Sequence, residues 1–151
     1  HVGRVMKKLL IATHGQLADG YKSSLSILTG MQDAVEYIDA YVDESDYTPK
    51  LQSFIDSIGA DDTGIIFTDI YGGSVFQKVA LMLDGRENIF HVTGINLGLV
   101  IELLLSDEAI TKAYLEEVIS AARNGMQLVT FEGTNPQPGG EEEFLTDAFF
   151  K

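Results

Sequence analysis

One histidine and one aspartate each follow one of the most apolar segments of the chain. His14 comes after residues 7–13 (KKLLIAT), and Asp69 comes after residues 64–68 (GIIFT). Short apolar runs bounded by turn residues are typical of strands buried inside a parallel sheet. In an open α/β sheet, the carboxyl ends of parallel strands share one edge, and ligands bind there. The sequence therefore predicts that these two side chains meet at one edge of the sheet.

The chemistry that this pair could perform centres on the imidazole of His14. Imidazole is a nucleophile and a general base near neutral pH. The Asp69 carboxylate could bind one ring nitrogen, define the tautomer and leave the other nitrogen facing outward. Gly15 gives the backbone freedom and clears space beside the ring. A lone histidine there would be read as a polar residue closing a strand, but the matched aspartate favours a functional role.

A glycine-rich turn, Gly72-Gly73-Ser74, follows the aspartate and opens a predicted helix. Free backbone N–H groups at a helix start attract anions, and the serine hydroxyl adds a donor. A phosphoryl group carried on His14 would need such a cradle, with the Gly73 and Ser74 N–H groups sharing its charge. The alternative is a tight turn in which Ser74 only caps the helix. The glycine spacing and the missing lysine exclude a P-loop and a dinucleotide fingerprint.

Other kinds of site find little support in the sequence. The chain has no cysteine, so disulfides and thiolate chemistry are excluded. His91 lies inside a predicted strand and is read as structural. A zinc site would need more convergent ligands, so neither a metal nor a cofactor is expected.

The composition describes one acidic domain. The 151 residues carry a net charge of −13 and are 45% hydrophobic. Nucleic-acid binding requires clustered basic residues, so nucleic acid is not an expected partner, whereas a partner with a basic face would be attracted. No apolar run reaches the length of a membrane span, and no signal-peptide pattern is present, so a cytoplasmic location is expected.

Three regions are expected along the chain. Residues 1–5 precede the first methionine and are interpreted as a remnant left from expression. Residues 6–134 form the domain. Residues 135–151 form a tail, which begins with a proline- and glycine-rich segment and continues with acidic and aromatic residues.

Hydrophobic patterns alternate between the strand and helix types. Strands are predicted at Lys7–Thr13, Val35–Val42, Thr63–Thr68, Asn88–Thr93 and Met126–Phe131. Helices are predicted at Leu17–Leu28, Asp46–Ile58, Ser74–Leu83, Leu97–Leu105 and Thr111–Asn124. This alternation predicts an α/β fold of three layers, with helices on both faces of a largely parallel, open sheet.

With these residues identified, the chain resembles the mannose-family IIA components of the bacterial phosphoenolpyruvate-dependent sugar phosphotransferase system. Three blocks carry the resemblance, at residues 8–15 (KLLIATHG), 66–77 (IFTDIYGGSVFQ) and 94–102 (GINLGLVIE). It covers Met6 to about Phe131. It implies four parallel strands in the order 2-1-3-4, followed by a C-terminal antiparallel strand that two subunits of a dimer exchange. Met126–Phe131 is the segment that corresponds to that strand.

The resemblance also implies a function and partners. The chain would be a phosphocarrier, a phosphotransferase in which His14 accepts a phosphoryl group from HPr and passes it to a IIB component. Asp69 corresponds to the supporting aspartate of the family, and Gly72, Gly73 and Ser74 to its glycine-serine turn. The membrane components IIC and IID would be indirect partners and would select the sugar.

Two alternatives accompany this interpretation. The phosphotransfer subunit of dihydroxyacetone kinase has a similar fold and an early histidine, but it lacks the Gly-Gly-Ser turn. A non-catalytic regulatory module could also use this fold. In addition, some family members have an aromatic residue two positions after the histidine, where this chain has Gln16, so a different surface towards the partner is expected.

Overall fold

Four parallel strands form one sheet at the centre of the computed structural model, which describes residues 6–131. The strands are β1 (Lys7–His14), β2 (Val35–Ala40), β3 (Thr63–Thr68) and β4 (Ile89–Thr93). Their order across the sheet is β2-β1-β3-β4, and every neighbouring pair is parallel. The predicted fold class and strand order are confirmed.

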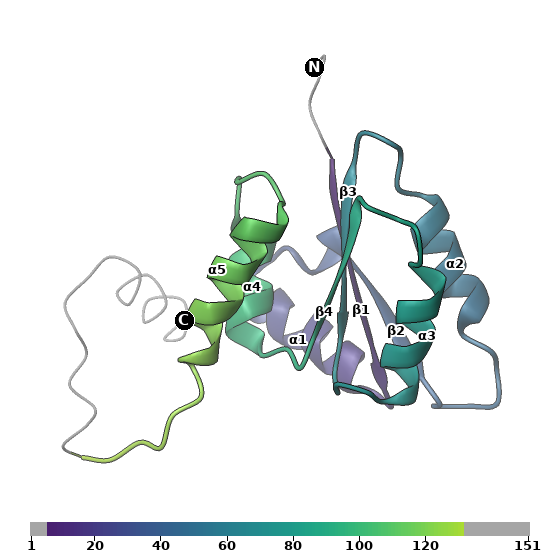
Figure 1. The fold of residues 1–151 in the computed structure, drawn as a ribbon. Helices are drawn as coiled ribbons and strands as arrows, with labels where there is room; N and C mark the ends of the chain where they lie inside the picture. The colour runs from purple at the N-terminus through teal and green to yellow at the C-terminus, as the bar shows by residue number, and fades with distance from the viewer. Residues whose placement is uncertain (1–5, 132–151) are drawn as a thin grey trace.

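Helices cover both faces of the sheet, as Figure 1 shows. One face carries α2 (Thr48–Asp56) and α3 (Ser74–Met82); the other carries α1 (Leu17–Thr29), α4 (Leu97–Leu105) and α5 (Lys112–Arg123). A short 3-10 helix, η1 (Gln32–Ala34), leads into β2. None of the helices among residues 6–131 is long and apolar enough to cross a membrane.

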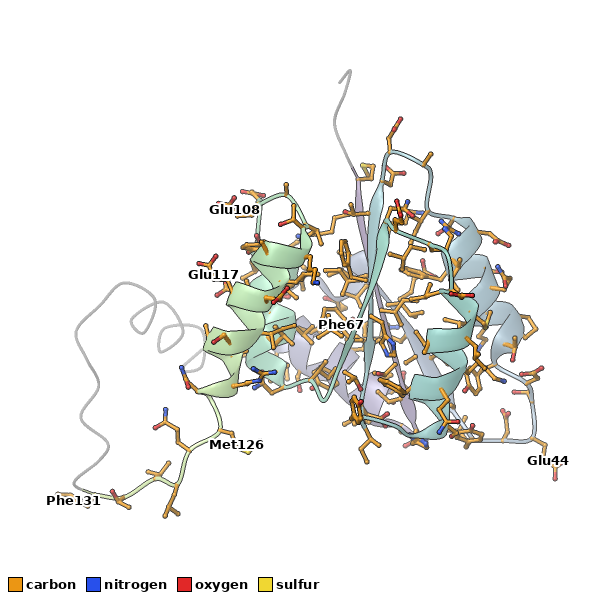
Figure 2. All side chains as sticks on the ribbon, in the orientation of Figure 1. Glu44, Phe67, Glu108, Glu117, Met126 and Phe131 are labelled. Carbon is orange, nitrogen blue, oxygen red and sulfur yellow. The ribbon has the colours of Figure 1, made fainter. Side chains whose placement is uncertain are left out.

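The core consists of two apolar layers, one on each side of the sheet. Successive residues of a strand point to opposite faces, so Leu9 and Ile11 pack under α1 and α4, whereas Leu10 and Ala12 pack under α2 and α3. Phe67, which Figure 2 labels, belongs to the first layer and is fully buried. The continuous apolar run in β1 is thus explained by burial on both faces.

Local sequence signals define where the helices begin and end. Gly30 takes a left-handed conformation (φ 68°), and its N–H donates to the carbonyls of Leu25 and Ser26, which ends α1 as predicted. The Asn96 and Thr111 side chains accept the Leu99 and Tyr114 N–H groups and so cap α4 and α5.

The helix predicted at Asp46–Ile58 is two residues shorter at each end, and two predicted strands also differ from the structure. The second strand ends at Ala40 rather than Val42, because Tyr41 has a positive φ of 67° that no strand accommodates. Residues 126–131 form no strand within this single chain. They extend away from the body, with Met126 and Phe131 87% and 97% exposed (Figures 1 and 2). Their exchange between two subunits stays a prediction, and the tail at residues 135–151 lies outside the described residues, as do residues 1–5.

Two glycines provide opposite tests of the packing. An alanine Cβ at Gly64 in β3 would overlap the Cδ1 atom of buried Ile58, so Gly64→Ala should lower the free energy of unfolding by about 1–3 kcal/mol.

Gly20 lies inside α1 with open space around it. Gly20→Ala should therefore raise that free energy by about 0.5–1 kcal/mol. Urea unfolding followed by circular dichroism measures both, and an unchanged Gly64→Ala protein would contradict this view of the core.

Candidate active site

The carboxyl ends of β1 and β3 bring His14 and Asp69 together. In the register of the sheet Ala12 lies beside Thr68, so the chain leaves both strands at the same level. The Asp69 carboxylate accepts the backbone N–H of His14 at 2.8 Å and lies 3.0 Å from the ring atom Nδ1. It also accepts the N–H of Ile70 at 3.0 Å. One carboxylate therefore holds both the backbone and the ring of the histidine.

Electrostatics favour an ionised Asp69. Burial opposes the charge, since the side chain is only 11% exposed, but the hydrogen bonds from His14 outweigh this effect and hold the pKa of Asp69 below its usual value. A carboxylate facing Nδ1 accepts a hydrogen bond from it, so Nδ1 carries the hydrogen and Nε2 has the lone pair. The His14 side chain is 41% exposed, so the imidazole is accessible at the surface.

Ser74 faces the second ring nitrogen. It is the first residue of α3, and its Oγ lies 3.3 Å from His14 Nε2. The residue at the N-cap is Gly73, and the Ser74 hydroxyl makes no capping bond, so the alternative of a simple helix cap is wrong. The N–H groups in the first turn of a helix have no carbonyl partner inside it. The serine hydroxyl and this helix start therefore face the same nitrogen.

The two glycines of the turn have different roles. An added Cβ at Gly73 would lie 3.0 Å from Ile70 Cγ2 and 3.3 Å from His14 Cε1, so a side chain at this position would crowd the ring. The Gly73 N–H already donates to the carbonyl of Ile70 at 3.2 Å, which leaves it less suited to the charge-sharing expected of it. Gly72 has a φ of 79° and forms the turn itself, and its carbonyl accepts a bond from Gln77.

The sequence analysis missed one member of this cluster, Tyr41. Its ring centroid lies 5.5 Å from that of His14, and its hydroxyl donates to Ser74 Oγ at 2.9 Å. Gln16, which stands where some family members have an aromatic residue, is at the N-cap of α1. In this protein an aromatic ring beside the histidine comes from Tyr41, directly after β2. A tyrosine inside the predicted strand Val35–Val42 gives no signal of a positive φ, and only the folded backbone shows where its ring goes.

His91 lies apart from this cluster, inside β4. Its Nε2 is 2.8 Å from Thr68 Oγ1, which in turn donates to Thr93 Oγ1, so Nε2 is the protonated nitrogen. Burial lowers the pKa of His91 to about 4. Among residues 6–131 no group of three or more histidine or acidic side chains could hold a metal ion.

The site is a surface edge rather than an enclosed pocket. A hollow of about 290 Å³ lies at the edge of the sheet, where Tyr37, Ile38 and Lys50 of β2 and α2 contribute to its lining. It contains none of the residues that surround His14. Small-molecule sites are usually concave and enclose most of the ligand, so the exposed imidazole is better suited to a macromolecular partner.

Fold and site together define an open α/β protein with an exposed histidine, held by an aspartate, at the carboxyl edge of a parallel sheet, and the comparisons specify the family. The family described as "PTS system fructose IIA component" (EIIA-man) matches residues 8–122. Because this match covers more than half of the chain, the protein belongs to that family. It is therefore a sugar phosphotransfer subunit of the phosphotransferase system (PTS), as the resemblance implied.

Solved structures agree with this assignment. A protein of Klebsiella pneumoniae described as a candidate PTS permease is 28% identical, with a TM-score of 0.74 over 85% of this chain and 94% of that one. A PTS IIA protein associated with the fucose utilization operon of Streptococcus pneumoniae is 26% identical (TM-score 0.68; 82% and 93% covered). The component EIIA of Streptococcus agalactiae is also 26% identical (TM-score 0.69; 84% and 98% covered).

The titration of His91 provides a test of its buried position. Its pKa falls from 6.5 to about 4 on folding, so between these values the unfolded chain binds more protons than the native chain. Stability must then decrease as the pH falls from 6.5 towards 4. His91→Gln removes the titration but keeps an N–H donor for Thr68. Urea unfolding between pH 7 and 4.5 should show the parent losing more stability than the variant, and equal losses would contradict the assignment.

Proposed function

We propose that the protein is a phosphocarrier in which Nε2 of His14 accepts a phosphoryl group from HPr and passes it to a IIB component. The observation that carries this proposal is the arrangement of the ring. Asp69 binds Nδ1 at 3.0 Å, and Ser74 Oγ lies 3.3 Å from Nε2. One nitrogen is thus held and protonated, whereas the other is exposed beside a hydroxyl and the start of a helix.

The transfer conserves atoms and charge. The Nε2 lone pair of His14 attacks phosphorus while the phosphorus–nitrogen bond of the donor breaks and its electron pair stays on the donor imidazole. The Nδ1 proton remains in its bond to Asp69, whose negative charge stabilises the ring as it becomes positive. The Ser74 hydroxyl and the N–H groups at the start of α3 can stabilise the negative phosphoryl oxygens.

The surroundings of His14 support a protein as donor and acceptor. Its ring lies at an exposed edge, and the net charge of −13 would attract partners with a basic face. We place the protein in the cytoplasm, where such partners would meet it. We also propose a homodimer in which Met126–Phe131 pairs with the sheet of the second subunit, since β4 is an edge strand.

Phosphorylation should occur on His14 alone. Incubation with phosphoenolpyruvate, the general phosphotransferase enzyme and HPr should label the parent with an acid-labile, base-stable phosphate. His14→Ala should take up no label, because no other described histidine has an exposed nitrogen beside an anion-binding turn. His91→Gln is the matched control and should be labelled like the parent. Peptide mapping that finds the label on Ser74, or label that persists in His14→Ala, would overturn the mechanism.

Asp69 should control the rate of transfer. Asp69→Asn keeps one acceptor oxygen, which can accept the backbone N–H of His14 or that of Ile70 but not both, and it loses the charge that orients and stabilises the ring. We expect phosphoryl transfer to slow by roughly 10²–10⁴-fold, measured by rapid quench with phosphorylated HPr.

Asp69→Ala distinguishes the effect of the carboxylate on stability from its effect on the transfer rate. It removes the backbone bonds as well, so it should also lower the free energy of unfolding by about 1–3 kcal/mol. Thermal unfolding of both variants measures this difference. An Asp69→Asn protein that accepts phosphate at the parent rate would remove Asp69 from the mechanism.

A further inference from the structure

Tyr41 has a backbone conformation that its side chain disfavours. Among residues 6–131 it is the one non-glycine residue with a positive φ, at 67°. In this region the Cβ of an L-residue crowds the neighbouring carbonyl, so glycine and asparagine are the usual occupants. Strained residues of this kind concentrate at functional sites. The conformation turns the chain at the end of β2 so that the tyrosine ring lies beside His14.

Two contacts hold the ends of β1 and β2 together at this turn. His14 pairs with Ala40 in the sheet, and the Gly15 N–H donates to the carbonyl of Ala40 at 2.7 Å. Tyr41 follows directly. Its ring is 57% exposed and lies 5.5 Å from the imidazole, centroid to centroid, with 32° between the ring planes. The side chain therefore covers one side of the histidine ring without burying it.

Tyr41, Ser74, His14 and Asp69 form a chain of hydrogen bonds. The donors at the two ends of this chain determine which group donates in the middle. Tyr41 donates its hydroxyl proton to Ser74 Oγ at 2.9 Å. At the other end Asp69 keeps the proton of His14 on Nδ1. The Ser74 proton then has one acceptor in reach, the Nε2 lone pair at 3.3 Å. Tyr41 thus determines the direction in which the serine hydroxyl points.

Tyr41 is itself held in place by a contact with Tyr47. Buried Tyr47 packs edge-on against its ring, with centroids 5.7 Å apart and an interplanar angle of 82°. Lys78 of α3 lies 4.6 Å from the centroid of Tyr47 and donates to Thr48 Oγ1 at 2.7 Å. The hydrogen bond with Ser74 lowers the pKa of Tyr41 below its usual value.

We propose that Tyr41 is a positioning residue for phosphoryl transfer at His14, acting through the hydroxyl of Ser74. The inference rests on the function proposed above. Before transfer, the Ser74 proton is donated to the Nε2 lone pair and holds the ring in place. As the bond from Nε2 to phosphorus forms and the donor bond breaks, the serine proton turns to a phosphoryl oxygen. Tyr41 continues to donate to Ser74 Oγ throughout, so the serine proton is directed first at Nε2 and then at the phosphoryl oxygen.

The first test separates the hydroxyl of Tyr41 from its ring. Tyr41→Phe keeps the ring beside His14 and removes only the donor. We expect the kcat of transfer from phosphorylated HPr to fall roughly tenfold, the value of one hydrogen bond, and KM to stay within about twofold. Tyr71→Phe is the matched control, because Tyr71 is exposed nearby and its ring contacts Phe76. It should transfer at the parent rate.

A double-mutant cycle tests whether Tyr41 acts through Ser74. If it does, Tyr41→Phe should change kcat far less in a Ser74→Ala background than in the parent. Equal effects in both backgrounds, or an unchanged kcat for Tyr41→Phe in the parent, would overturn the proposal. Loss of activity with unfolding would be recognised by circular dichroism, and Tyr41→Phe is expected to keep the parent spectrum.

A measurement without phosphate separates this inference from the proposed function. In ¹⁵N NMR spectra of the unphosphorylated protein, Tyr41→Phe should move the Nε2 resonance of His14, because its bond from Ser74 weakens, and should leave the Nδ1 resonance nearly in place. Tyr71→Phe should move neither. An unmoved Nε2 resonance would overturn the role of Tyr41. A parent protein that takes no phosphoryl group from HPr would overturn the proposed function, whatever the spectra show.

Discussion

The contact between His14 and Asp69 is the interaction on which the site depends. One carboxylate accepts the backbone N–H of His14, faces its Nδ1 and accepts the N–H of Ile70. It therefore ties the end of β1 to the turn after β3 and orients the imidazole at the same time. Because burial of this carboxylate is compensated by the bonds that it receives, it is ionised at neutral pH. Strand position and ring tautomer are thus determined together.

The rest of the site is arranged around the nitrogen that Asp69 does not hold. Ser74 and the start of α3 approach from one side, and Tyr41 approaches from the end of β2. Gly73 lacks a Cβ where the ring comes closest. The imidazole stays exposed because these groups come from turns at the edge of the sheet rather than from its interior. A protein partner can reach such an edge, whereas an enclosed pocket would exclude one.

The strained turn at Tyr41 connects the end of β2 with the start of α3. The turn brings a side chain from the β2 side of the sheet to the serine that follows β3. Tyr47 and Lys78 connect the loop after β2 to α3, so the tyrosine and the serine are held relative to each other. The unfavourable φ is tolerated because several contacts hold this side chain, a pattern that is common at functional sites.

Much of the architecture was predictable because its signals are local. The apolar run before His14, the left-handed glycine after α1 and the caps of α4 and α5 all act within a few residues. The four parallel strands and their helices were therefore identified correctly, and their order followed from the resemblance to the family. The pairing of His14 with Asp69 was also expected, since parallel strands end at a common edge. The end of β2 was not, because it depends on what the backbone meets in space, and the exchange of Met126–Phe131 between subunits stays a prediction.

The sequence by itself determined the types of the elements, the edge at which they end and the identity of the histidine and its carboxylate. Hydrophobic periodicity and turn residues encode these features locally. Only the tertiary structure decided which nitrogen is held, that the N–H of Gly73 is occupied, and that Tyr41 completes the chain of hydrogen bonds. These depend on distances of about 3 Å between segments far apart in the chain. Such distances follow from packing and backbone strain, which no local pattern records.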